Sequence, residues 1–137
     1  MKKVLTTGTF DIIHPGHLYF LKKAKKMGDY LIVVIARDRT VRQIKRRPSL
    51  YSEKQRQAHL KKLKIANRVI LGYLGDKLKI VQRMKPDVIC LGYDQRVFTH
   101  NLKNELAKRG HYPTIVRLKA HKPHKFKSSL LRQNLIK

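Results

Sequence analysis

Cysteine is almost absent from this sequence, because Cys90 is the only one among 137 residues. A single thiol excludes any disulfide within the chain. Cys90 also lies inside the apolar run Val88-Ile89-Cys90-Leu91, where a cysteine behaves as a small buried hydrophobe. We therefore assign it no catalytic role.

Long apolar runs are also missing. No stretch approaches the roughly 20 residues that a membrane-spanning helix needs, and residues 1–5 lead into a strand-like pattern without the features of a secretory leader. We expect a soluble, cytoplasmic protein with no membrane partner. With 42% hydrophobic residues, a chain of this length suits one compact domain over residues 1–137.

Acidic residues are the third scarcity, with 8 Asp plus Glu against 33 Lys plus Arg and a formal charge of +25. Such a surface attracts polyanions, and a triphosphate, nucleic acid or an anionic membrane would all qualify. The net charge of the protein therefore indicates only that its partner is negatively charged. Asp11 and Asp94 are the acids of most interest, because each lies at a glycine-containing turn after an apolar strand pattern.

Strand and helix patterns alternate along the chain. Apolar, β-branched runs predict strands at residues 3–7, 30–36, 67–71, 87–92 and 114–118. Helical spacing predicts helices at 17–28, 52–64, 76–85 and 101–109, and a short one from Ser128, with a basic loop at 42–48. The alternation predicts an α/β fold, a Rossmann-like doubly wound five-stranded parallel sheet with helices on both faces.

Ligands of such sheets bind beyond the carboxyl ends of the strands, at a topological switch point. The turns after the first and fourth predicted strands are therefore the candidate site. These turns carry Asp11, His14, His17 and Asp94.

Two histidines on a turn that opens a helix can bind phosphate. His14 and His17 can donate hydrogen bonds to phosphate oxygens, while the helix N-terminus adds its amides and positive dipole end. Gly16 lets the backbone approach a phosphate closely, and Pro15 stiffens the turn. Taken alone, a His-x-x-His pair could also arise by chance or bind a metal.

The whole segment Gly8 to His17 resembles the signature of the cytidylyltransferase-like family, Gly-Thr-Phe-Asp followed by His-x-Gly-His. The resemblance implies nucleotidyl transfer, with His14 and His17 contacting the triphosphate and stabilising the transition state. It also implies that Thr9 and Phe10 frame the nucleotide, and that a divalent cation such as Mg²⁺ takes part. Asp11 either helps to place the metal or orients the turn.

The family has a second signature near the C-terminus, usually similar to Arg-Thr-x-Gly-Ile-Ser-Thr-Thr. Ser128 and Ser129 match its paired hydroxyls, and Arg132 could reach a phosphate. The Arg-Thr-x-Gly part is absent, so lysines of the basic segment 119–137 would have to supply its charge. The alternative is an ordinary serine N-cap on a solvated basic helix.

Within the family the sequence is most similar to archaeal-type FAD synthases, on residues 14–21, 34–38 and 91–95. This implies transfer of AMP from ATP to FMN, with pyrophosphate released and Asp94 contacting the nucleotide. The alternative is a resemblance to glycerol-3-phosphate cytidylyltransferase, which uses CTP. Arg56 matches an arginine of that enzyme and could bind the phosphate of either acceptor.

Two further expectations concern partners. Relatives of this size often form dimers, so the resemblance implies a homodimer. The charge also leaves a nucleic-acid-binding domain without catalysis as a distant third hypothesis, although the aromatic residues are not interleaved among the basic runs as a stacking surface requires.

Overall fold

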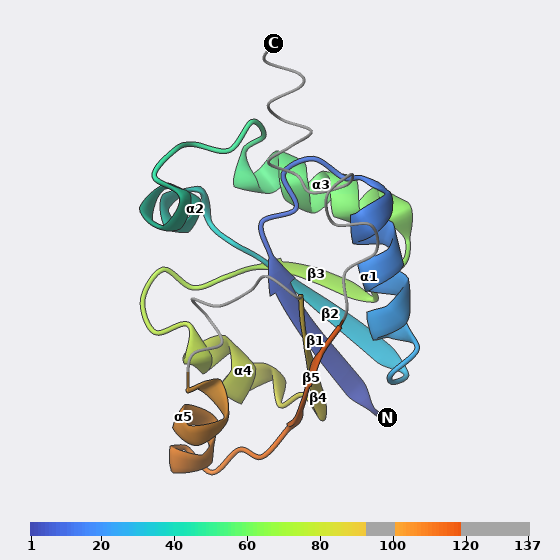
Figure 1. Cartoon of the computed structure of the whole chain (residues 1–137), viewed down its shortest axis with the longest axis vertical. Coiled ribbons are helices and arrows are strands. Elements are labelled where there is room, and N and C mark those ends of the chain that lie inside the picture. Colours follow the sequence, from blue (N-terminus) through green and yellow to red (C-terminus); the bar gives the residue numbers. More distant parts are fainter. Residues whose placement is uncertain (93–100, 119–137) are drawn as a thin grey trace.

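Five parallel strands form the centre of the computed structural model, which describes residues 1–92 and 101–118. They lie in the order β3-β2-β1-β4-β5 (Figure 1). Each lies within one residue of its predicted position at either end, so the expected doubly wound parallel sheet is confirmed. The strands are β1 (Lys3–Gly8), β2 (Tyr30–Ile35), β3 (Arg68–Leu71), β4 (Val88–Leu91) and β5 (Thr114–Arg117).

Helices cover both faces of the sheet. The helices are α1 (Pro15–Lys25), α2 (Asp38–Lys45), α3 (Glu53–Leu63), α4 (Leu78–Met84) and α5 (Leu102–Lys108). α1 and α3 pack on one face and α4 and α5 on the other (Figure 1). Alternate strand residues supply the two cores, as with Val4 on the α1 side and Leu5 on the α4 side.

Local contacts account for the start of α3, and the predicted burial of Cys90 is confirmed. Ser52 and Gln55 form a reciprocal capping box that opens α3, with the Gln55 amide donating to Ser52 Oγ at 3.2 Å and the Ser52 amide donating to Gln55 Oε1 at 2.9 Å. Cys90 is fully buried in the core on the α1 side. Burial raises the pKa of its thiol to about 11, so the reactive thiolate is disfavoured.

The region after β2 differs from the prediction. The sequence predicted a basic loop over residues 42–48, but a helix, α2, runs through Lys45 and ends at Arg46, which has a left-handed φ of 58°. Thr40 and Val41 are buried on its inner side, and this short amphipathic stretch is masked in the sequence by its exposed basic residues. The loop is therefore shorter than expected and begins at Arg46.

The strand order places the candidate site. β1 pairs with β2 on one side and with β4 on the other, so the chain reverses its direction of winding between β1 and β4. In a sheet of this order, ligands bind beyond the carboxyl ends of the strands at the switch point, which here lies between β1 and β4. No helix within residues 1–92 and 101–118 is long and apolar enough to cross a membrane.

Gly28 provides a test of how closely α1 packs on the start of β1. A Cβ atom at Gly28 would lie 2.7 Å from the carbonyl oxygen of Lys2 and 2.7 Å from Cγ2 of Val4. We predict that Gly28→Ala lowers the free energy of unfolding by about 1–3 kcal/mol, because backbone has to move to admit the methyl group. Urea unfolding followed by circular dichroism measures this.

Gly75→Ala is the matched control, since a Cβ there would meet nothing within 4 Å. Its unfolding free energy should stay within about 0.5 kcal/mol of the wild type. Equal stability of the two variants would contradict the packing described for Gly28.

Candidate active site

The loop between β1 and α1 has a strained, closely packed start. Phe10 is 4% exposed and adopts a left-handed φ of 52°, which is unusual for a bulky residue. Its ring folds back over Gly8, where a Cβ would lie only 2.6 Å from Phe10 Cε2. Glycine at position 8 therefore allows Phe10 to lie under the loop. Strain of this kind persists only where surrounding contacts hold the backbone, and it is common at functional sites.

His14 and His17 lie together at the start of α1. His14 is the N-cap, Pro15 is the first helical residue, and the Gly16 amide donates to His14 Nδ1 at 3.1 Å. Because Nδ1 accepts this bond, neutral His14 carries its proton on Nε2. The two imidazole rings stack with centroids 3.9 Å apart, and Phe10 lies 5.2 Å from the His17 ring.

The first amides of α1 are engaged within the protein. The Gly16 amide bonds to the His14 side chain, and the amides of His17 and Leu18 donate to the His14 carbonyl at 2.9 and 3.2 Å. Pro15 has no amide hydrogen. The sequence suggested that these amides would bind phosphate directly. In this structure the side chains and the helix dipole are the groups that a phosphate would meet here.

Burial keeps both histidines uncharged. Desolvation, together with smaller effects of the neighbouring His14 and Lys45, lowers the pKa of His17 to about 3, although a hydrogen bond to the Ile12 backbone opposes them. Desolvation also lowers the pKa of His14. At neutral pH the site therefore presents two neutral imidazoles next to a positively charged surface.

Asp11 fastens this loop to the segment that precedes α3. Its carboxylate is 5% exposed. One oxygen accepts from the Leu50 amide at 2.8 Å and the other from the Tyr51 amide at 2.9 Å. Of the two roles left open for Asp11, orientation of the turn is the one that these contacts support.

Arg56 fastens the same two segments from the inside. Its side chain is 0% exposed, and its guanidinium donates to the carbonyls of Thr9 at 2.8 Å and Tyr51 at 3.2 Å, and to Asp38 Oδ1 at 2.8 Å. The resemblance suggested that Arg56 binds substrate phosphate. The structure instead places it beneath the loop, where it holds Thr9 and Tyr51 in position.

Glu53 and Arg37 extend the network to the ends of β2 and β3. Glu53 accepts from the Asp38 amide and from Arg37, both at 2.9 Å, and Arg37 Nε donates to the Gly72 carbonyl at 2.7 Å. No role was predicted for Arg37, Asp38 or Glu53, although Arg37 and Asp38 lie within residues 34–38, which carry the family resemblance. The signal that could have found them is the scarcity of acids, since two of only eight lie in this one network.

The remaining predicted site residues lie outside the described part of the chain. Asp94 follows β4, and Ser128, Ser129 and Arg132 belong to the C-terminal segment 119–137. Their predicted contacts with the nucleotide stay predictions. Among the described residues, Thr9, Phe10, His14, Pro15, Gly16 and His17 are brought together on one loop and helix start.

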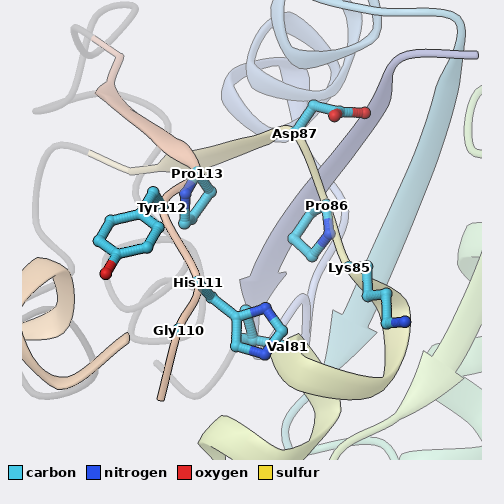
Figure 2. Close-up of a pocket in the computed structure, with 8 residues that line it drawn as sticks. All are labelled: Val81, Lys85, Pro86, Asp87, Gly110, His111, Tyr112 and Pro113. Carbon is cyan, nitrogen blue, oxygen red and sulfur yellow. The ribbon is translucent and has the colours of Figure 1, made fainter. Parts of the chain in front are cut away.

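A hollow of about 240 Å³ lies elsewhere in the molecule, and Figure 2 shows the residues that line it. It lies between the segments that lead into β4 and β5, residues 85–87 and 110–113, with Val81 of α4 at its base. These segments precede their strands, so the hollow is at the amino edge of the sheet. The histidines are at the opposite, carboxyl edge, and the hollow is not part of their site.

Comparison with known proteins agrees with the loop geometry. The model of a family described as cytidylyltransferase-like matches residues 5–134. The chain belongs to this family. It is therefore a nucleotidyltransferase, as the signature from Gly8 to His17 predicted, and its switch-point loop is the family's signature loop in this protein.

Two curated relatives cover most of the chain. An FAD synthase of Ferroglobus placidus is 49% identical over 120 residues, which are 88% of this chain and 78% of the relative. An FAD synthase of Thermoplasma volcanium is 41% identical over 136 residues, which are 99% and 95% of the two chains.

A solved structure is similar as well. The crystal structure of a protein described as the lipopolysaccharide core biosynthesis protein of Thermoplasma volcanium superposes with a TM-score of 0.84 at 43% identity. The match covers 89% of this chain and 99% of that one. The fold is thus shared with this similar protein.

Arg56 should be a positioning residue. We predict that Arg56→Lys lowers the free energy of unfolding by about 3–5 kcal/mol, because a single ammonium group cannot replace the forked donors to Thr9, Tyr51 and Asp38. Turnover should fall with it, since the loop that carries the histidines loses its support. Arg39→Lys, at an exposed position of α2, is the control. A fully stable Arg56→Lys variant with only a raised KM for the acceptor would support direct phosphate binding instead.

The neutral state of His17 makes the protein sensitive to acid. Because its folded pKa of about 3 lies below the ordinary value of 6.5, only the unfolded chain binds this proton between those two pH values. Stability is therefore complete above about pH 6.5 and falls as the pH drops towards 3. Between pH 7 and 5, we predict that the free energy of unfolding falls by about 1–2 kcal/mol less in His17→Gln than in the wild type. Urea titrations at both pH values measure this, and an NMR titration of His17 near pH 6.5 would refute it.

Proposed function

We propose that the protein is an FAD synthase that transfers the adenylyl group of ATP to FMN and releases pyrophosphate. The observation that carries the proposal is the identity of 41–49% with relatives named FAD synthase, across 86–99% of this chain. The sequence comparison and the residues quoted from the signature point to the same reaction. The description of the similar crystal structure names a pathway and no reaction, so it does not oppose this proposal.

The reaction requires an oxygen of the FMN phosphate to attack the α-phosphorus of ATP. A new P–O bond forms to the acceptor, and the bond from the α-phosphorus to the bridging oxygen of the β-phosphate breaks. The electron pair of that bond leaves with pyrophosphate. Negative charge grows on oxygens that are already anionic, so the protein acts mainly by positioning and by electrostatic stabilisation.

His14 and His17 are the donors that we assign to those oxygens. Both are neutral in the free protein, so they offer N–H groups without the desolvation cost of a buried cation. A triphosphate beside them raises their pKa values, because an anion favours the charged form. The positive end of the α1 dipole acts in the same direction.

The buried network lets these donors act without rearrangement. Asp11 and Arg56 fix both ends of the segment from Thr9 to Asp11 against the Leu50–Tyr51 backbone. A loop held in this way keeps its geometry when phosphate binds, which is what preorganised electrostatic catalysis needs. Thr9, Phe10, Pro15 and Gly16 frame the nucleotide in this proposal.

The residues outside the described part complete the proposal. Asp94, which follows β4, is assigned to the nucleotide, where a carboxylate accepts from an amine or a ribose hydroxyl. Ser128, Ser129 and Arg132 are assigned to the phosphates, with lysines of segment 119–137 supplying charge. A homodimer is proposed on the resemblance alone.

Residues 1–92 and 101–118 do not provide a complete set of protein ligands for Mg²⁺. No group of three His, Cys, Asp or Glu side chains there could hold a metal ion, and both oxygens of Asp11 accept backbone amides. We propose that Mg²⁺ enters bound to the triphosphate and water, as is usual for this ion. The roles of the protein residues above do not depend on a protein-bound metal.

A substrate matrix tests the proposal. Purified protein with Mg²⁺ is given ATP or CTP in combination with FMN or glycerol 3-phosphate, and products are identified by mass. We predict FAD and pyrophosphate from ATP and FMN only. Formation of CDP-glycerol would overturn the proposed substrates while keeping the chemistry, and removal of Mg²⁺ with EDTA should abolish turnover.

His17→Ala is the active-site control for the same assay. Loss of one preorganised donor should lower turnover about 10²–10³-fold, whereas an exposed variant such as Arg39→Ala should leave it unchanged. Near-normal turnover in a folded His17→Ala protein would refute the assigned role of His17.

A further inference from the structure

The C-terminal turns of α1 and α3 lie at the amino edge of the sheet, opposite the histidines. α1 returns the chain from β1 to β2, and α3 returns it from β2 to β3. Because all these strands are parallel, both helices run from the carboxyl edge back to the amino edge. Their C-terminal turns therefore end at the same edge (Figure 1), and Lys25 Nζ donates to Asn67 Oδ1 across the two connections.

Lysines dominate these two helix ends. The C-terminal end of α1 with its C-cap contributes four and that of α3 with its C-cap contributes three, and all but the half-buried Lys25 are exposed. We call this group the lysine edge. Its members are Lys22, Lys23, Lys25, Lys26, Lys61, Lys62 and Lys64.

The nearby acids do not neutralise the lysine edge. Asp29 accepts from the Lys2 amide at 2.9 Å and Asp87 accepts from the Lys3 amide at 2.8 Å, so both carboxylates are bound to backbone. Within residues 1–92 and 101–118, no lysine of the edge forms an ion pair with a carboxylate. The edge therefore presents a concentrated positive field to solvent.

Helix stability does not account for this number of charges. Cations near a helix C-terminus interact favourably with the dipole, but the effect falls off within the last turn and is screened by salt. Seven like charges on adjoining helix ends also repel one another. A bound polyanion would relieve that repulsion, which is the physical reason to look for one.

The side chains of the edge favour a nucleic acid over a membrane. The large exposed apolar residues of the described chain lie at its N-terminus, in α2 or in loops, and none lies on α1 or α3, so these helices offer nothing to insert into lipid. They also offer no fully exposed aromatic ring for base stacking, and the half-buried Tyr19 has Lys23 Nζ over its ring, 5.6 Å from the centroid. Ammonium groups that contact phosphates read no sequence.

We propose that the lysine edge binds the phosphate backbone of a nucleic acid without sequence preference. The edge lies across the sheet from His14 and His17, so a strand bound there leaves the nucleotide site open. This second activity does not rest on the proposed FAD synthesis, and either can fail without the other.

Fluorescence anisotropy with labelled RNA and DNA duplexes of about 20 base pairs tests the proposal between about 50 and 200 mM KCl. The test variant is Lys22→Gln/Lys26→Gln/Lys62→Gln in the full chain. Loss of three phosphate contacts should reduce the slope of log Kd against log salt by about 2–3. Affinity at about 0.1 M KCl should fall roughly tenfold or more.

The matched control removes the same charge from the opposite face of the sheet, as Lys79→Gln/Lys103→Gln/Lys108→Gln. Its affinity and salt slope should stay close to those of the wild type, and both triple variants should keep full FAD-forming activity and unchanged unfolding curves. The basic segment 119–137 is identical in all three proteins, so it contributes equally to each.

Three results would overturn the proposal. One is equal weakening by the two triple variants, which would mean that net charge alone is responsible. Another is a wild type that binds neither duplex at about 0.1 M KCl. The third is binding to phosphatidylserine vesicles that the edge variant loses while nucleic-acid binding is unchanged. A preference between RNA and DNA would identify the partner within the proposal.

Discussion

The buried guanidinium of Arg56 is the contact on which the active site depends. It joins the carbonyls of Thr9 and Tyr51 and the carboxylate of Asp38, and so ties the signature loop to α2 and to the start of α3. A buried cation is costly unless every donor direction is used well. Here hydrogen bonds to three separate segments of the chain offset the cost of desolvating the guanidinium. Asp11 holds the signature loop against the Leu50–Tyr51 backbone from the outer side. The loop can then carry a strained Phe10 and keep it in place.

The neutrality of the histidines follows from that rigid setting. Packing of the His14 and His17 rings against one another excludes water, and desolvation lowers their pKa values more than the weak opposing hydrogen bond raises that of His17. In a protein of charge +25, permanently charged histidines at this point would add to the repulsion within the free enzyme. Neutral rings avoid it and, in the proposed reaction, gain charge only when phosphate supplies the compensating field.

Sequence periodicity was sufficient to predict the sheet. It was insufficient to predict the buried contacts of Arg56 beneath the candidate site. Strands such as β2 are continuous β-branched runs, and Ser52 with Gln55 marks the start of α3, so local pattern determines both. The eight-residue α2 was missed, because only Thr40 and Val41 are buried and their signal is lost among basic neighbours. Arg56 looked like a surface phosphate ligand because burial depends on tertiary contacts with residues 5 to 47 positions away.

The few acidic residues of the chain hold the fold together and do little to balance its positive charge. Each acid of the described residues accepts a hydrogen bond from a backbone amide or a basic side chain, so the few carboxylates serve as fixed anchors for the fold. They are Asp11, Asp29, Asp38, Glu53, Asp76, Asp87 and Glu105. In the described part of the chain, Glu105 pairs with the exposed Lys108, and the other acids form no ion pair with a lysine. Most of the basic excess is therefore left for solvent and for anionic partners. In our proposals these partners are the triphosphate at one edge of the sheet and a nucleic-acid backbone at the other.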